Sequence, residues 1–148
     1  MRTRLDATTA TPFSEPVRRF LDDLRFASVA TIDPDGAPRQ AIVWYRLEPD
    51  GRIMINSAVG RRWPANLERD GRAALSIEEG YAWVGLDGVV DETDHDWDRS
   101  HADIAALARR YHADEPEKAE RLIEGRFASQ ERVTFRIRVT AIHDHLED

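Results

Sequence analysis

The chain has 148 residues, of which 41% are hydrophobic and 33% charged, a size and composition typical of one globular domain and not of a disordered segment. Its 21 basic and 28 acidic residues give a formal charge of −7, which disfavours nucleic acid and anionic membranes as partners. Cysteine is absent, which excludes disulfides, thiolate nucleophiles and cysteine-ligated metal centres, so any redox chemistry depends on a borrowed cofactor.

The sequence pattern favours neither a signal peptide nor a membrane-spanning segment. No stretch approaches 18 consecutive apolar residues, and residues 1–11 lack the apolar core of a signal peptide. We therefore expect a cytoplasmic protein that forms one domain over residues 1–148, with a loose arm over residues 1–12.

A helix and a hairpin are predicted next. Ser14 precedes Glu15 and Pro16, a pattern typical of a capped helix start, and the apolar residues that follow, as far as Leu24, recur at helical spacing. Residues 27–32 form a short β-branched run that ends in Asp-Pro-Asp-Gly, a turn sequence.

Residues 39–47 are predicted to form one strand with apolar side chains on both faces, so this strand is either covered on both sides or lines a pocket. Pro-Asp-Gly at 49–51 gives the next turn, and residues 52–57 give the third strand. Residues 60–70 predict a loop that enters a short helix, with Pro64 at its first position and Gly71 beyond its end.

Strand character returns at residues 73–78 and 81–90, where Gly85 and Gly88 indicate a bend or bulge. Residues 94–127 predict two helices, the second from about Glu115. Residues 132–142 alternate most regularly, with Val133, Phe135, Ile137 and Val139 expected inward and Thr134, Arg136, Arg138 and Thr140 outward. Six mostly antiparallel strands with few helices favour a small closed barrel, because closure removes exposed edges.

The strongest candidate site is the segment 56–67. It leaves a strand with Asn56 and Ser57, passes through Gly60, supplies Arg61 and Arg62 and then opens a helix. Guanidinium groups beside a helix N-terminus are suited to holding a phosphate. From spacing alone, a solvated pair of surface arginines is an equally good interpretation.

Aromatic residues flank that segment: Trp44, Trp63, Tyr81 and Trp83. Flat rings could wall a tricyclic cofactor, although the residues alone favour a role in the core or in a dimer contact.

Metal binding and serine catalysis are poorly supported. His143 and His145 are two ligands where a structural metal site needs more, so residues 143–148 are predicted to be a solvated end. Ser57, Ser76 and Ser129 lack a nucleophile elbow, which disfavours acyl-enzyme chemistry.

Five motifs in this order and spacing carry a family resemblance over nearly the whole chain. They are Ala27-Ser28-Val29-Ala30-Thr31 with Asp35-Gly36-Ala37-Pro38, then Val43-Trp44, then Asn56-Ser57 with Gly60-Arg61, then Asn66-Leu67-Glu68-Arg69-Asp70 with Arg72, and Tyr81-Ala82-Trp83-Val84. In these motifs the chain resembles the split β-barrel proteins related to pyridoxamine 5'-phosphate oxidase, in particular their short F420-dependent branch. The resemblance implies a mainly β, six-stranded antiparallel split barrel of the FMN-binding type.

The same resemblance implies a homodimer packed barrel to barrel, with two equivalent cofactor sites at the interface. It implies the following contacts: Asn56, Ser57, Arg61 and Arg62 on the phosphate side, Arg39, Val43 and Trp44 along the ring system, and Trp83 from the other subunit. Gly60 and Trp63 are also expected among the cofactor-binding residues. Asn66 is expected to tie down the short helix. Trp63 is a departure, because many relatives place lysine there; Arg62 could substitute for that cation.

The activity implied is hydride transfer from reduced coenzyme F420 to a small conjugated organic substrate, with the cofactor performing the chemistry. A proton could come from solvent, Tyr45 or Tyr81. The alternatives are an FMN-dependent oxidase or reductase of the same fold, a non-catalytic flavin- or heme-binding module, and a plain dimeric scaffold.

Overall fold

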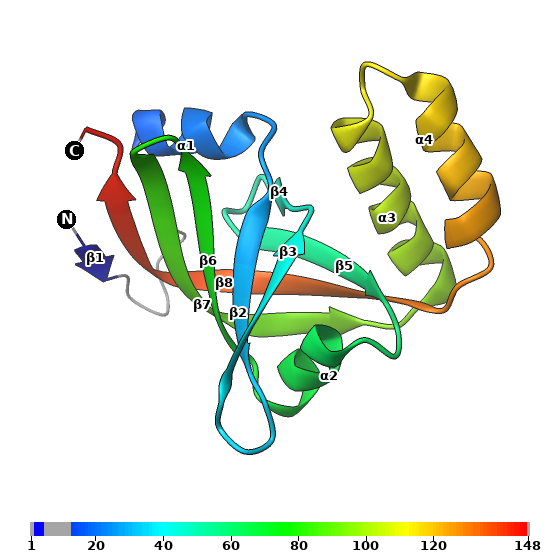
Figure 1. The fold of residues 1–148 in the computed structure, drawn as a ribbon, viewed down its shortest axis with the longest axis horizontal. Coiled ribbons are helices and arrows are strands. Elements are labelled where there is room, and N and C mark those ends of the chain that lie inside the picture. The colour runs from blue at the N-terminus through cyan, green and yellow to red at the C-terminus, as the bar shows by residue number, and fades with distance from the viewer. Residues whose placement is uncertain (1, 5–12, 148) are drawn as a thin grey trace.

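The computed structural model describes residues 2–4 and 13–147, and in these residues one antiparallel sheet curls around the core (Figure 1). The strand order is β3-β2-β6-β7-β8-β5-β4, and β1 pairs with β8 off this path. The strands are β1 (Arg2–Arg4), β2 (Ala27–Ile32), β3 (Pro38–Val43), β4 (Arg46–Leu47), β5 (Ile53–Ala58), β6 (Arg72–Glu79), β7 (Ala82–Asp94) and β8 (Arg132–His145). The helices are α1 (Glu15–Asp22), α2 (Arg62–Arg69), α3 (Trp97–Tyr111), α4 (Pro116–Leu122) and the π-helical turn η1 (Ile123–Phe127).

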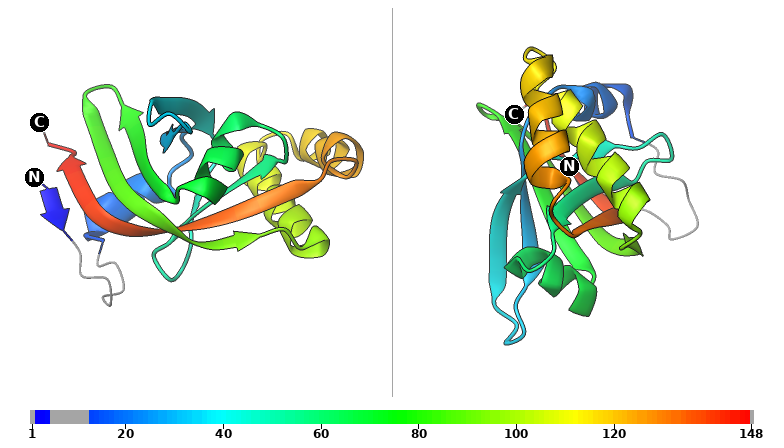
Figure 2. Two further views of the ribbon diagram at one scale, coloured as in Figure 1. Left: turned by 90° about the horizontal axis from the view of Figure 1, so that it is seen from below. Right: turned by 90° about the vertical axis from the view of Figure 1, so that its right-hand side faces the viewer.

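The sheet has the predicted split-barrel character. Its two end strands, β3 and β4, are consecutive in the chain and are joined only by Trp44 and Tyr45, so the sheet must bend back on itself (Figure 2). The predicted count of six strands was wrong, because Arg2–Arg4 adds β1 and because the single strand expected over residues 39–47 is divided into β3 and β4. The arm expected over residues 1–12 was thus wrong at Arg2–Arg4, while residues 5–12 lie outside the described part of the chain.

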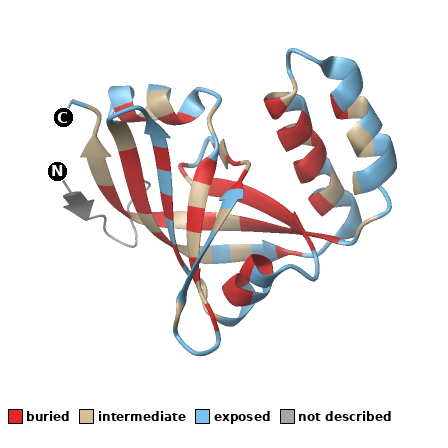
Figure 3. Cartoon of the chain, in the orientation of Figure 1, coloured by how far each residue is buried: buried red, intermediate tan, exposed pale blue. Residues whose placement is uncertain are grey.

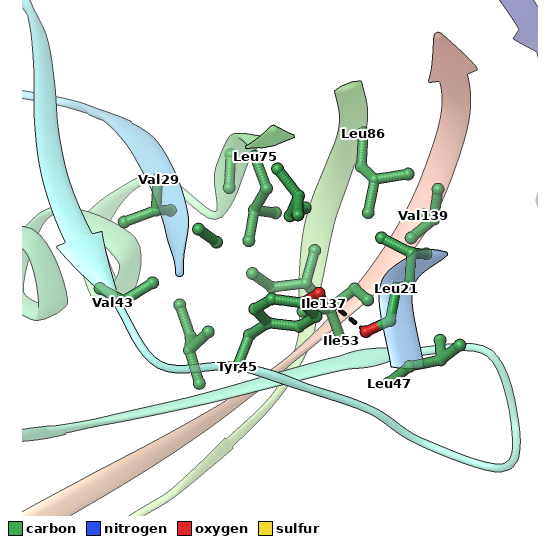
Figure 4. Packing of buried hydrophobic residues seen from close by; sticks show 14 of the residues in the cluster. Leu21, Val29, Val43, Tyr45, Leu47, Ile53, Leu75, Leu86, Ile137 and Val139 are labelled. Carbon is green, nitrogen blue, oxygen red and sulfur yellow. Dashed lines mark hydrogen bonds between the residues drawn. The ribbon is translucent and has the colours of Figure 1, made fainter. Parts of the chain in front are cut away.

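The break between β3 and β4 turns Tyr45 into the core (Figure 4). Its hydroxyl donates a hydrogen bond of 2.7 Å to the carbonyl oxygen of Leu21 in α1. Its backbone N–H, which lacks a strand partner here, donates to the hydroxyl of Tyr111 at 3.1 Å. The sequence could not reveal the break, since alternation on both faces reads as one continuous strand.

The main core lies inside the barrel, and α1 closes over it with Val17 and Leu21. Ser14 caps this helix as predicted, its hydroxyl accepting a hydrogen bond from the N–H of Val17 at 3.3 Å. Figure 4 shows the side chains that meet there, among them Val29, Val43, Leu47, Ile53, Leu75, Leu86, Ile137 and Val139.

A second core lies on the other face of β5 and β8, beneath α3 (Figure 3). It contains Met54, Ile104, Leu107 and Tyr111, with Trp44 and Phe127 packed against it. The prediction that Thr134 points to solvent was therefore wrong: the residue is fully buried, because α3 covers the face that the pattern left polar.

The helical predictions hold with shifted bounds. Two helices follow residue 94, and the second begins at Pro116. The short helix α2 begins at Arg62, two residues before the predicted Pro64. Among the described residues, no helix combines the length and the apolar character needed to cross a bilayer.

The C-terminal histidines are part of β8, so the solvated end predicted over residues 143–148 was wrong at residues 143–145, while residue 148 lies outside the described part of the chain. His143 Nε2 lies 3.2 Å from the Asp87 carboxylate, and the His145 ring stacks on Trp83 at 4.1 Å between centroids. Strand pairing with β7 orders this segment, a long-range contact that its polar sequence does not indicate.

The bulge predicted near Gly85 and Gly88 is present as a register shift between Asp87 and Gly88. A Cβ atom at Gly88 would lie 2.5 Å from Ile137 Cγ2 and 2.8 Å from the backbone oxygen of Arg138. Only glycine therefore allows β7 and β8 to approach this closely.

We expect Gly88→Ala to lower the free energy of unfolding by about 1–3 kcal/mol, because a backbone atom on the opposing strand cannot move aside cheaply. Urea denaturation followed by circular dichroism would measure the loss. Gly125→Ala is the matched control, since no atom lies within 4 Å of a Cβ there. Equal stability of wild type and Gly88→Ala would contradict the close approach.

Candidate functional site

A pocket of about 280 Å³ lies between the barrel and the helical segment α3 to η1. Its wall includes five predicted site residues: Val43, Trp44, Asn56, Arg61 and Trp63. We call it the aromatic pocket. The residues come from the end of β3, from β5 and from the start of α2, so the fold brings together segments that the sequence placed apart.

A second pocket of about 730 Å³ lies between the β2–β3 turn and the start of α2. Arg39, Gly60, Arg61 and Arg62 line it, and we call it the arginine pocket. Gly60 has φ of +106°, a left-handed conformation that favours glycine, and this sets the direction in which the chain enters α2. Arg61 lines both pockets and so marks where they meet.

Trp44 is fixed by aromatic neighbours from the helical segment. Its ring stacks on Tyr111 with centroids 5.2 Å apart and planes 10° apart, and it meets the edges of His112 and Phe127 at 5.5 and 6.3 Å. Phe26 stacks on Tyr111 in turn. Because several rings hold it, Trp44 presents a rigid flat wall to the aromatic pocket.

Trp63 stands where the family resemblance led us to expect a lysine. Its side chain is buried, and its ring lies 6.0 Å from that of Phe135 in the barrel core. The residue therefore joins the pocket wall to the core and supplies no cation.

Arg132, at the start of β8, brings a cation to the pocket that the sequence did not predict. Only 4% of the residue is exposed, yet it lines the aromatic pocket. Its Nε donates to Asn56 Oδ1 at 3.0 Å and its Nη1 to Gln130 Oε1 at 2.6 Å. Burial, followed by the positive charges of Arg61 and Arg126, lowers the pKa of Arg132 to about 10.

Asn56 and Ser57 both form hydrogen bonds within the protein. Besides accepting from Arg132, the Asn56 amide donates to Ser100 O and Thr134 Oγ1, both at 2.9 Å. Asn56 thus positions the buried arginine as well as lining the pocket. The buried Ser57 hydroxyl donates to Ala58 O at 2.9 Å, and Ser57 lines neither pocket.

Asp33 organises the arginine pocket. Its Oδ2 accepts from Arg39 Nε and Nη2 at 3.1 and 2.8 Å and lies 3.8 Å from Arg62 Nη1. The Arg39 guanidinium, and then the Asn66 amide, hold the pKa of Asp33 below its usual range. Asn66 also donates to Thr31 Oγ1 at 3.1 Å, so it ties α2 to the end of β2.

The remaining predicted residues lie elsewhere. Trp83 lines a pocket on the outer face of the sheet and belongs to neither pocket described above. Tyr81 is 93% exposed, in the turn between β6 and β7. Burial raises the pKa of Tyr45, whose hydroxyl is bonded inside the core. Neither tyrosine lines the aromatic pocket, whereas His112, which the sequence did not single out, does.

Within residues 2–4 and 13–147, no group of three or more histidine and acidic side chains is arranged so that it could hold an ion.

Comparisons with known proteins agree with this architecture. An F420H2-dependent biliverdin reductase of Mycobacterium tuberculosis is 26% identical over 117 residues, covering 78% of this chain and 85% of that protein. A solved structure of an F420 reductase has a TM-score of 0.72 at 22% identity and covers 88% of this chain and 98% of its own. HutZ, a heme storage protein of Vibrio cholerae, has a TM-score of 0.65 at 17% identity, covering 88% and 93%.

The structural neighbours show the fold, which enzymes and a storage protein share. The family described as pyridoxamine 5'-phosphate oxidase matches residues 13–146, which include β2 to β8 and both pockets. The chain therefore belongs to the pyridoxamine 5'-phosphate oxidase family.

Proposed function

We propose that the chain is a cytoplasmic, F420-dependent oxidoreductase that reduces a small conjugated organic substrate. The observation that carries the proposal is the position of Arg61, which joins a pocket walled by tryptophan to a pocket lined by arginine. A cofactor that has a flat ring system at one end and a phosphate at the other matches this pair of pockets.

The residues fit such a cofactor in chemistry as well as in position. Val43 and Trp44 would contact the ring system. Arg61 and Arg62, beside the start of α2, would hold the phosphate, and no side chain caps this helix start. Arg39 is already paired with Asp33, so we assign it a supporting role in which it keeps that carboxylate from repelling the phosphate.

Reduced F420, when bound, supplies the hydride. The protein contributes position and surroundings: Tyr111 holds Trp44 flat, and the segment α3 to η1 covers the aromatic pocket. No side-chain nucleophile is needed. The imidazole of His112 lies in the pocket wall, where it is a candidate to hold a proton at Nδ1 or Nε2.

The choice of F420 over FMN is supported by the relative named as an F420H2-dependent reductase and by the F420 reductase of the same fold. FMN carries the same combination of ring and phosphate and is the competing cofactor. The protein would be a binding module and not an enzyme if it held either cofactor without turnover.

Titration of the purified apoprotein with F420 and FMN side by side tests the proposal. Quenching of tryptophan fluorescence should report binding, with F420 the tighter ligand, and Trp44→Leu should remove much of the signal and affinity. Trp97→Leu is the matched control, because Trp97 is half exposed on α3 and lies outside both pockets. Failure of both cofactors to bind wild type would overturn the proposal.

The site is also proposed to be shared between two copies of the chain. The outer face of β2 and β6 carries small side chains, Ser28, Ala30, Ala74 and Ser76, which allow close packing. Beside them on β3, Ile42 is 70% exposed and also lines the aromatic pocket. An exposed apolar side chain at the edge of a ligand pocket is suited to contact with a second subunit, whose Trp83 could then approach the site.

We expect Ile42→Glu to convert the dimer into monomer and to weaken cofactor binding with it, because a buried carboxylate at the interface would be unpaired. Light scattering and a cofactor titration would measure the two effects. Ala113→Glu, an exposed change in the loop between α3 and α4, should alter neither. A monomeric wild-type protein that binds cofactor at full affinity would contradict the shared site.

A further inference from the structure

Three guanidinium groups, from three separate parts of the chain, line the aromatic pocket. Arg61 comes from the loop before α2, Arg126 from η1 and Arg132 from the start of β8, and all three line the pocket. The positive charges of Arg61 and Arg126 both act on Arg132, whose pKa they lower after the larger effect of burial.

Among the described residues, no carboxylate forms an ion pair with any of these three arginines. Arg132 donates to the neutral side chains of Asn56 and Gln130, and none of the three arginines forms an ion pair within 4.0 Å there. A buried charge without a counter-charge is unfavourable for folding, so its presence calls for a ligand of opposite sign.

Arg136, four residues further along β8, lines neither the aromatic pocket nor the arginine pocket and offers a comparison. Its Nε donates to Glu48 at 2.9 Å, and its Nη2 donates to Asp103 at 3.1 Å. With Glu92 at 4.0 Å as a third, acidic residues thus compensate the half-buried Arg136. The more deeply buried Arg132 has no acidic partner among the described residues.

Arg132 is also held in place. Asn56 and Gln130 fix two of its nitrogens, and its guanidinium carbon lies 4.9 Å from the centre of the Phe127 ring. Preorganised donors lose little conformational entropy when a ligand arrives, which is a property of binding sites and not of solvated surface arginines.

We propose that Arg132, together with Arg61 and Arg126, forms an oxyanion site that takes a carboxylate or phosphate group inside the aromatic pocket. The site adds Arg126 and Arg132 to Arg61, which lines both pockets. The inference rests on one part of the proposed function, namely that the aromatic pocket binds a ligand. The oxyanion belongs either to the organic acceptor or to the cofactor.

Binding of inorganic phosphate to the apoprotein, followed by the NMR signals of arginine Nε–H groups, tests the site directly. Arg132→Gln should weaken phosphate binding by about tenfold or more, since a charge-assisted hydrogen bond is lost. Arg126→Gln should weaken it by a smaller factor. Arg121→Gln is the matched control, because Arg121 is exposed on α4 outside the pocket.

Equal phosphate binding by wild type and a folded Arg132→Gln variant would overturn the site. If thermal unfolding shows that Arg132→Gln does not fold, the exposed Arg126→Gln variant decides in its place, and unchanged binding there overturns the site equally.

A comparison of FMN with riboflavin, which lacks the phosphate, identifies the source of the oxyanion. If Arg132→Gln weakens FMN and not riboflavin, the group is the cofactor's phosphate. If Arg132→Gln binds both flavins with unchanged affinity but binds inorganic phosphate more weakly, the group belongs to the acceptor. Both outcomes support the site. The proposed function fails separately, if wild type binds phosphate but neither F420 nor FMN.

Discussion

Replacing both Arg61 and Arg62 by alanine is expected to weaken cofactor binding by about a hundredfold or more. Arg61 lines both pockets and Arg62 lines the arginine pocket, so a phosphate near the start of α2 would lose two charge-assisted contacts. Each such contact contributes about 1.5–3 kcal/mol. Fluorescence titration with F420 and with FMN would give the dissociation constants.

The single variants should differ. The Arg62 side chain is 62% exposed and lies 3.8 Å from Asp33, which already attracts it, so Arg62→Ala should have the smaller effect. Arg72→Ala is the control, since Arg72 pairs with Asp70 on the surface and lines neither pocket. Unchanged affinity in the double variant would remove this segment from the cofactor site.

The second large effect is expected for Phe135→Ala, which should lower the free energy of unfolding by about 3–5 kcal/mol. Phe135 is completely buried on β8, between Ile55 of β5 and Thr93 of β7. Truncation would leave a cavity in the centre of the barrel that the surrounding strands cannot close. Urea denaturation monitored by circular dichroism measures the change.

Phe26→Ala is the matched control, because Phe26 is 60% exposed and packs mainly against Tyr111. We expect a loss below about 1 kcal/mol for it, in line with its small buried area. If both variants lost a similar amount of unfolding free energy, packing inside the barrel would not be the main source of stability. Because the ring of Phe135 also touches Trp63, tryptophan emission should change in the core variant alone.

The barrel could be predicted because its determinants are local. Turn sequences such as Asp33-Pro34-Asp35-Gly36 and the alternation of β8 specify hairpins and an inward face without reference to distant residues. The predictions that were wrong concern residues that contact segments distant in the sequence. Thr134 is buried only because α3 returns over β8, and β8 extends to His145 only because β7 pairs with it.

The site was predicted in part for the same reason. Motif residues from β3, β5 and α2 do meet in the aromatic pocket, but Ser57 and Trp83 line neither of the two pockets. The sequence did not predict Arg132 as a site residue, because an arginine on the polar face of a strand is normally exposed to solvent. Only the covering helical segment turns that face into the wall of a pocket.

The hydroxyl of Tyr111 couples the helical segment to the place where β3 and β4 separate. It accepts a hydrogen bond from the backbone N–H of Tyr45, at the break between β3 and β4, and donates one to the carbonyl oxygen of Arg25 at 2.6 Å. A shorter homologue without the α3 to η1 segment would leave a buried amide with no acceptor, or would need to merge β3 and β4 into one straight strand. The α3 to η1 segment and the break between β3 and β4 therefore depend on each other, and a variant that loses the segment should also lose the break.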